Sequence, residues 1–236
     1  MKIEHGTNTI NGRTVIKDSI AEQSKKALQS EIRLPLTQSE TLKLLGTEEE
    51  VRMIEQFEET VSKLDTLRMR VAEDRTRSAV ERLYLFNQKS KPYIDNIRTT
   101  GNKLREYYIN SQSSYESQKF SNNTELTQLD VAVLPQFVSV VSDDENTLSV
   151  GSLTEAEGRL MVSLMKSYPS VVSDNYDATS VSEELDRRFT PTAYAQSKVY
   201  AEALTNFDAL SQSLVNSISN AMPQQLIETL KSKRVA

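Results

Sequence analysis

The longest uninterrupted stretch of this chain runs from Thr47 to Lys91, without a glycine or proline to break a helix. Thr47, followed three residues later by Glu50, matches a capping box, in which each residue satisfies a free backbone N–H group of the other. Apolar residues then recur at steps of three and four, which places them on one helical face. They are Val51, Ile54, Phe57, Val61, Leu64, Leu67 and Val71. The sequence therefore predicts a long amphipathic helix that starts at Thr47.

A corner at residues 87–92 is expected to end this helix. Pro92 disrupts the interior of a helix but suits the first turn of a new one. In the second helix Gly101 falls within the apolar series, where it would let a partner helix approach closely or mark a bend. A short corner between two amphipathic helices predicts an antiparallel hairpin over residues 47–120. The apolar series of the second helix is Ile94, Ile97, Gly101, Leu104, Tyr108 and Tyr115.

Two other stretches predict extended structure. Asn11-Gly12 lies between two β-favouring runs, which indicates a tight turn within an extended arm over residues 1–17. A flexible tail with a local turn explains the same residues. The β-branched runs on either side of Pro135 predict a β-hairpin at 137–150, which 129–134 would join. This hairpin completes a sheet within the chain or pairs with another chain, because an open strand edge recruits further strands.

The predicted fold class is mainly α: an elongated helical bundle built on the long antiparallel hairpin, with a small β-hairpin insertion and a β-prone N-terminal arm. Only six glycines and six prolines occur, which argues against an all-β fold. Thr154 with Glu157, and Thr190 with Pro191, predict two later helix starts. The predicted segments are an arm over 1–17, a helical hairpin domain over 18–125, a β-hairpin or connector over 126–152, and a C-terminal helical segment over 153–236.

The composition argues against catalysis. The chain has no cysteine and one histidine, His5, which removes thiolate metal sites and leaves a single imidazole near a terminus. An enzyme would have to rely on carboxylates such as Glu55, Glu58 and Glu59. We therefore expect no catalytic residue, no bound cofactor and no metal site.

Three arginines invite a second hypothesis. Arg68, Arg75 and Arg82 are each seven residues apart, so on a continuous helix they would form a stripe that can track phosphates. Interleaved acids favour the alternative that the stripe is a solvated, ion-paired face. The net charge of −5 also weakens nucleic-acid binding in general.

The sequence thus predicts a structural or assembly protein that acts through contacts with other proteins or with copies of itself. Nucleic-acid binding or a regulatory role through the arginines is the alternative. A chain that lacks the residues of most catalytic sites suits a virion or secretion-apparatus component. No stretch is apolar enough to predict a transmembrane segment or a classical signal peptide. The expected contact residues are Ile10, Val15, Gly101, Phe137, Val138 and Val140.

Overall fold

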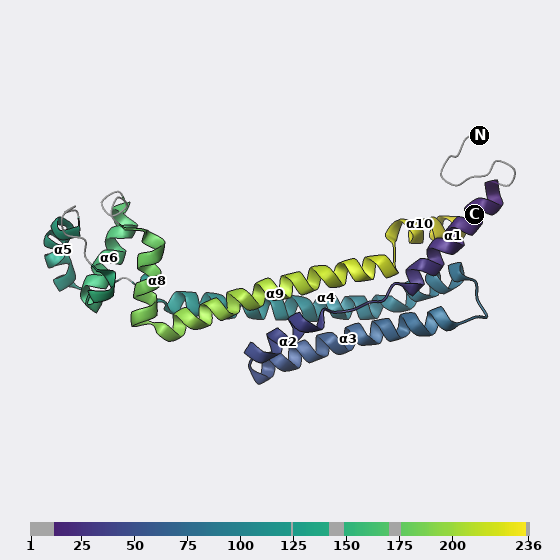
Figure 1. Cartoon of the computed structure of the whole chain (residues 1–236), viewed down its shortest axis with the longest axis horizontal. Coiled ribbons are helices and arrows are strands. Elements are labelled where there is room, and N and C mark those ends of the chain that lie inside the picture. The colour runs from purple at the N-terminus through teal and green to yellow at the C-terminus, as the bar shows by residue number, and fades with distance from the viewer. Residues whose placement is uncertain (1–11, 124, 142–148, 170–175, 235–236) are drawn as a thin grey trace. The chain divides into compact units, whose positions relative to one another are not determined.

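The computed structural model describes residues 12–123, 125–141, 149–169 and 176–234, and these residues are mainly helical (Figure 1). No strand occurs among them. The prediction of a mainly α fold is therefore confirmed. The α-helices are α1 (Gly12–Gln29), α2 (Leu36–Leu45), α3 (Glu48–Glu73), α4 (Ala79–Gln118), α5 (Gln128–Val141), α6 (Glu155–Ser167), α8 (Ala178–Phe189), α9 (Pro191–Ala221) and α10 (Gln224–Arg234). Two short 3-10 helices cover Phe120–Asn122 and Val150–Ser152.

The chain forms two compact units. The first contains Met1–Glu106 and Ala203–Ala236, and the second contains Tyr107–Glu202. Both boundaries fall inside helices, one in α4 and one in α9. Neither boundary was predicted from the sequence, because neither position shows a linker composition.

A helical hairpin forms as predicted, but its corner lies elsewhere. The helix α3 begins after the capping box of Thr47 and Glu50 and ends at Glu73, and α4 begins at Ala79. In the turn, the Asp74 carboxylate accepts the Thr76 backbone N–H at 3.0 Å. Ser78 then caps α4: its hydroxyl accepts the Glu81 N–H at 3.3 Å, and the Glu81 carboxylate accepts the Ser78 N–H at 2.9 Å. The hairpin therefore turns at 74–78.

The predicted corner at 87–92 was wrong, because α4 continues through Pro92. A proline inside a helix leaves the carbonyl four residues earlier without its helical donor. Pro92 is exposed, so water can solvate the freed carbonyl of Gln88 on that side of the helix. The tertiary packing of α4 on both sides of Pro92 outweighs this local cost.

In the first unit α3 packs antiparallel against α4. Asn96 on α4 donates its side-chain N–H to the Thr60 hydroxyl on α3 at 3.2 Å, and Arg82 donates to the Ala72 carbonyl. The residue numbers thus increase along α4 while those of the partners on α3 decrease. The helix α9 is antiparallel to α4 in the same way. Its contacts include Arg105 with Asp208 at 2.9 Å and Ser90 with Met222 at 3.2 Å. Buried side chains from the three helices include Phe57, Leu64, Phe86, Leu104, Phe207, Leu210 and Leu214.

The second unit has its own hydrophobic core. The Phe120 backbone N–H donates to the Thr190 hydroxyl at 2.9 Å, which holds the first 3-10 helix beside the start of α9. Asp186 on α8 accepts the Ser121 backbone N–H at 2.7 Å and its hydroxyl at 2.9 Å. The helices α5 and α6 lie side by side, and α6 packs on α8 (Figure 1). The core residues are Phe120, Phe137, Val141, Leu153, Leu160, Met161, Val162, Leu164, Tyr176, Val181 and Leu185.

Both predictions of β structure were wrong within the described residues. The segments 129–134 and 137–141, expected as strands, form the single helix α5. Residues 150–152 form a 3-10 helix, and 142–148 lie outside the described residues. Residues 12–17 of the expected extended arm belong to α1, and 1–11 lie outside the described part. The segment of α5 forms a helix and not a strand because its apolar residues at helical spacing pack against the core. A strand would have no partner strand among the described residues.

Candidate functional site

Exposed apolar side chains are concentrated on α5. Among the described residues, seven large hydrophobic side chains are exposed, and four of them lie on this helix. Leu129 is 75 % exposed and Val131 is 55 % exposed. Exposed apolar groups that gather on one element, rather than scatter, make that element a candidate contact surface. The four are Leu129, Val131, Val133 and Val140.

The inward face of α5 explains why the helix holds its position. Asp130, Leu134, Phe137 and Val141 follow one another at steps of four, three and four, which is one stripe of a helix. Phe137 and Val141 belong to the core of the second unit, and Leu134 packs against it. This face is used internally, so it cannot be the contact surface.

Asp130 fixes the start of α5 and its contact with α6. Its carboxylate accepts the Thr127 backbone N–H at 2.9 Å and the Thr127 hydroxyl at 2.8 Å. The Thr127 hydroxyl in turn accepts the Asp130 N–H at 3.2 Å, so the two residues form a capping box. These hydrogen bonds from Thr127, together with Arg159 at 3.4 Å, lower the pKa of Asp130 below its ordinary value.

The outward face of α5 carries a second stripe. Leu129, Val133, Gln136 and Val140 again follow at steps of four, three and four, and all four are exposed. The only ionisable residue of α5 is Asp130, which is buried. The outward face is therefore uncharged and mostly apolar, while charged residues make up 26% of the chain as a whole. We call the four residues of this stripe the α5 seam.

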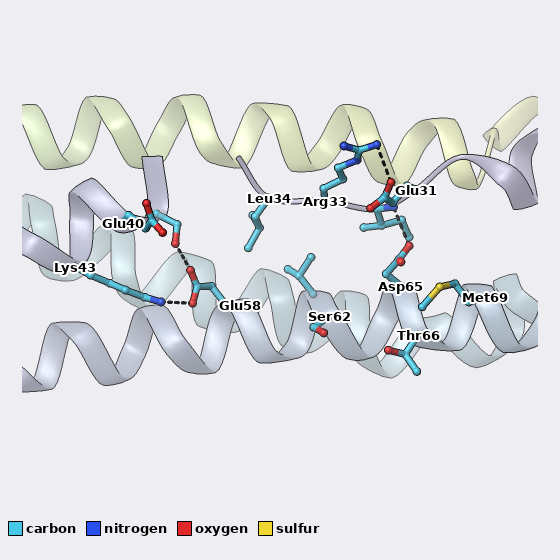
Figure 2. A pocket seen from close by; sticks show the side chains of 13 residues that line it. Glu31, Arg33, Leu34, Glu40, Lys43, Glu58, Ser62, Asp65, Thr66 and Met69 are labelled. Atoms are coloured by element: carbon cyan, nitrogen blue, oxygen red, sulfur yellow. Dashed lines mark hydrogen bonds and ion pairs between the residues drawn. The ribbon is translucent and has the colours of Figure 1, made fainter. Parts of the chain in front are cut away.

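A second candidate is a cavity of about 540 Å³ in the first unit. Figure 2 shows it between α2, α3 and the extended segment that joins α1 to α2. Glu58 accepts hydrogen bonds from Ser39 and from the Lys43 ammonium. Asp65 accepts the Ile32 backbone N–H at 2.9 Å. These carboxylates hold the connecting segment and α2 onto α3, which is a structural role.

The carboxylates suggested for an enzyme do not come together in the cavity, since only Glu58 of them lines it. Of the acids named as examples, Glu58 bonds Lys43, Glu59 pairs with Lys63 at 2.9 Å, and Glu55 is exposed. In the described part of the chain, no group of three or more His, Cys, Asp or Glu side chains is placed to hold a metal ion. The α5 seam is therefore the stronger candidate site.

The structure distributes the predicted contact residues over different environments. Gly101 lies within the helix packing of the first unit, where a Cβ atom would be 3.2 Å from the Phe57 ring. The close approach expected at Gly101 is thus made by α3 of the same chain. Phe137 is buried in the core of the second unit, Val138 is partly buried and packs against that core, and Val140 is exposed. Ile10 and the side chain of Val15 lie outside the described part of the chain.

The three arginines do not form a helical stripe. Arg68 on α3 is 7 % exposed, and it bonds the Asp65 carboxylate at 2.6 Å and the Leu28 carbonyl at 2.6 Å. Arg75 lies in the turn after α3, and Arg82 on α4 donates to the Ala72 carbonyl. The seven-residue spacing does not place the arginines on one face, because the helix ends at Glu73. Arg68 cannot contact a phosphate without giving up its internal partners.

Leu129, Val133 and Gln136 were not among the contact residues predicted from the sequence. Two signals could have found them. Thr127 followed three residues later by Asp130 is a helix start, and the two interleaved stripes at steps of four and three are helical. Both were obscured by the β-branched residues, which favour strands in isolation.

Comparisons with models of known protein families, with curated proteins and with solved structures found no match to this chain. Among the described residues, no helix combines the length and the hydropathy needed to span a bilayer.

Proposed function

We propose that the chain is a non-enzymatic structural or assembly protein, which acts through protein–protein contacts made by the α5 seam in a larger complex. The observation that carries the proposal is the exposed, uncharged face of α5. Full burial of a Leu or Val side chain gains about 1.5–3 kcal/mol relative to exposure. The three apolar residues of the seam therefore offer several kcal/mol to a partner that covers them.

The form of the surface favours a helix as the partner's contact element. A stripe at steps of three and four fits into the groove or against the face of another helix. Because α5 is already folded against its own core, little ordering entropy opposes the contact. A virion or a secretion apparatus is the kind of complex that we propose, since a chain with no cysteine and one histidine suits a component that carries out no chemistry.

A native pull-down with mass spectrometry tests the proposal. The full-length chain is compared with a seam variant, Leu129→Glu with Val140→Glu, and with a matched variant elsewhere, Val215→Glu. Val215 is 55 % exposed on α9, so its substitution adds a charge to a comparable surface. We expect the seam variant to lose the specific association, with itself or with a partner, that the wild type and Val215→Glu retain. Identical associations for all three proteins would overturn the proposal.

A further inference from the structure

The α5 seam has the residue pattern of a two-stranded coiled coil. In a heptad written a to g, steps of four and three place Leu129 and Gln136 at d, and Val133 and Val140 at a. A β-branched residue at a with leucine at d is the combination that favours parallel two-stranded pairing. The register follows from exposure, since the same helix buries a different stripe, 130, 134, 137 and 141.

The positions that flank the seam carry no exposed charge. In this register the e positions are Asp130 and Phe137, both buried, and the g positions are Ala132 and Ser139. Charged residues at e and g normally set which helices pair and in which orientation. In a symmetric contact each residue meets its own copy, so an exposed charge near the two-fold axis would repel itself. The face of α5 is free of this obstacle, although the chain as a whole carries a net charge of −5.

We propose that the occupant of the α5 seam is the α5 helix of a second copy of this chain, packed in parallel and in register. This inference rests on the proposed function and names its partner. The parallel orientation also places the two Gln136 side chains opposite each other, where their amides can hydrogen-bond. An antiparallel pair centred on the seam sets Gln136 against valine and leaves a buried amide without a partner, which is costly.

The contact between the two α5 helices is small, so we expect a weak dimer. Fourteen residues make a helix of about 21 Å. A seam of two heptads covers less than the roughly 800 Å² per partner of a standard interface, so the dimer is concentration-dependent. Within a larger assembly, further contacts of the same chains would raise its effective concentration.

Cysteine cross-linking tests the pairing directly, because the chain has no native cysteine. Leu129→Cys and Gln136→Cys are prepared as separate variants of the full chain and oxidised. The parallel, in-register pair predicts a disulfide-linked dimer for each variant. An antiparallel pair permits this at one of the two positions at most, since they are about 10 Å apart along the helix. The matched control is Val131→Cys, exposed on the same helix at position f, which faces away from the partner and should stay monomeric.

Sedimentation velocity over a range of concentrations provides the second measurement. We expect Val133→Glu to weaken self-association at least tenfold, because two like charges then meet at the seam. Val131→Glu introduces the same charge at position f and should leave self-association unchanged. Circular dichroism confirms that both variants keep their helix content, as substitutions at exposed positions should.

The outcomes separate this inference from the proposed function. Cross-linking at one seam position only, or equal cross-linking of the Val131→Cys control, overturns the parallel seam. A wild-type chain that remains monomeric at about 500 µM overturns self-pairing. Even a weak dimer, with a dissociation constant of about 100 µM, would be populated at that concentration. In that case the proposed function still stands if the seam variant loses a different partner in the pull-down, and it falls if no association depends on the seam.

Discussion

Asp130 on α5 and Arg159 on α6 form an ion pair with 3.4 Å between the carboxylate Oδ2 and the guanidinium Nε. The same carboxylate oxygen accepts both hydrogen bonds from Thr127. One side chain therefore starts α5 and also fastens it to the neighbouring helix. Arg159 is held in place by a second acid, Glu155, at 3.0 Å. The orientation of the α5 seam depends on this arrangement, because it fixes which face of the helix points inward.

Acid is expected to destabilise the second unit through Asp130. Hydrogen bonds from the Thr127 backbone N–H and hydroxyl, and then the Arg159 charge, lower the pKa of the folded carboxyl below its ordinary value of 3.8. The unfolded chain thus takes up the proton more readily. The stabilisation is present above pH 3.8 and is lost as the pH falls through the folded pKa. Thermal unfolding followed by circular dichroism should show the melting temperature falling below about pH 4.

The control for this pH effect is Asp130→Asn, which keeps the size of the side chain but cannot titrate. It should be less stable than the wild type at pH 7 and lose less stability between pH 5 and 3. Glu157 and Asp177 also have lowered pKa values, because they accept hydrogen bonds at the starts of α6 and α8, so some acid sensitivity will remain. A variant whose pH profile matches that of the wild type would contradict the role of Asp130.

Substitution of Pro92 distinguishes a helix interior from a helix start. Pro92 lies inside α4, so Pro92→Ala restores a backbone donor to the Gln88 carbonyl. We expect it to raise the free energy of unfolding by about 1–3 kcal/mol in urea denaturation. Ser78→Ala removes the cap of α4 and should lower the same quantity by about 1 kcal/mol. A neutral or destabilising Pro92→Ala would instead support a corner at 87–92.

Two glycines should respond differently to alanine. A Cβ at Gly158 would lie 3.1 Å from the Phe120 ring and 3.3 Å from Leu185, so it is confined by two buried side chains. Gly158→Ala should destabilise the protein, because overpacking costs about 1–3 kcal/mol and exceeds the gain of about 1 kcal/mol in helix propensity.

At Gly101 only the Phe57 ring, at 3.2 Å, is tight, and the next atom is 3.8 Å away. The better helix propensity of alanine, worth about 1 kcal/mol, should offset that contact and leave Gly101→Ala near neutral. Chemical denaturation of the two variants gives the comparison. A larger loss at Gly101 than at Gly158 would show that the α3–α4 approach is the tighter one.

Removal of Asp65 should be costly, because it holds both a buried arginine and the segment between α1 and α2. The Arg68 side chain is 8 % exposed and would lose the carboxylate that pairs with it, and the Ile32 N–H would lose its acceptor. We expect Asp65→Ala to lower the free energy of unfolding by about 3 kcal/mol.

The matched control is Glu59→Ala on the same helix, whose pair with Lys63 is exposed on both sides. It should cost at most about 0.5 kcal/mol, as surface ion pairs usually do. Urea denaturation of both variants measures the difference. Equal effects would mean that Arg68 finds another partner when Asp65 is absent.

Local hydrogen-bond chemistry made several helix starts predictable. The capping boxes of Thr47 with Glu50 and of Thr154 with Glu157 involve residues three apart, so no distant part of the chain is needed to form them. Pro92 shows the limit of the same reasoning. Proline favours a helix start, but the packing of α4 before and after Pro92 keeps the helix continuous there. The capping box of Ser78 and Glu81 instead starts α4.

The candidate site was less predictable than the helices around it. The β-branched residues of 129–141 fit a strand or a helix, and periodicity in a short apolar run does not decide between them. The decision came from the core of the second unit, which receives Phe137 and Val141 on one helical face and leaves Leu129 and Val133 outside. The three arginines do not share one helical face for a related reason, since a repeat of seven places residues on one face only within a continuous helix.

The sequence by itself determined that the chain is mainly helical, where several helices begin, and that it has no cysteine and a single histidine, because these depend on residue types and short-range contacts. Only the tertiary structure decided that α5 is a helix, that Arg68 and Gly101 serve internal packing, and that the α5 seam faces outward. The physical reason is that burial is a property of neighbours distant in sequence. Asp130 and Arg159, 29 residues apart, fix the orientation of α5, and neither residue alone reveals it.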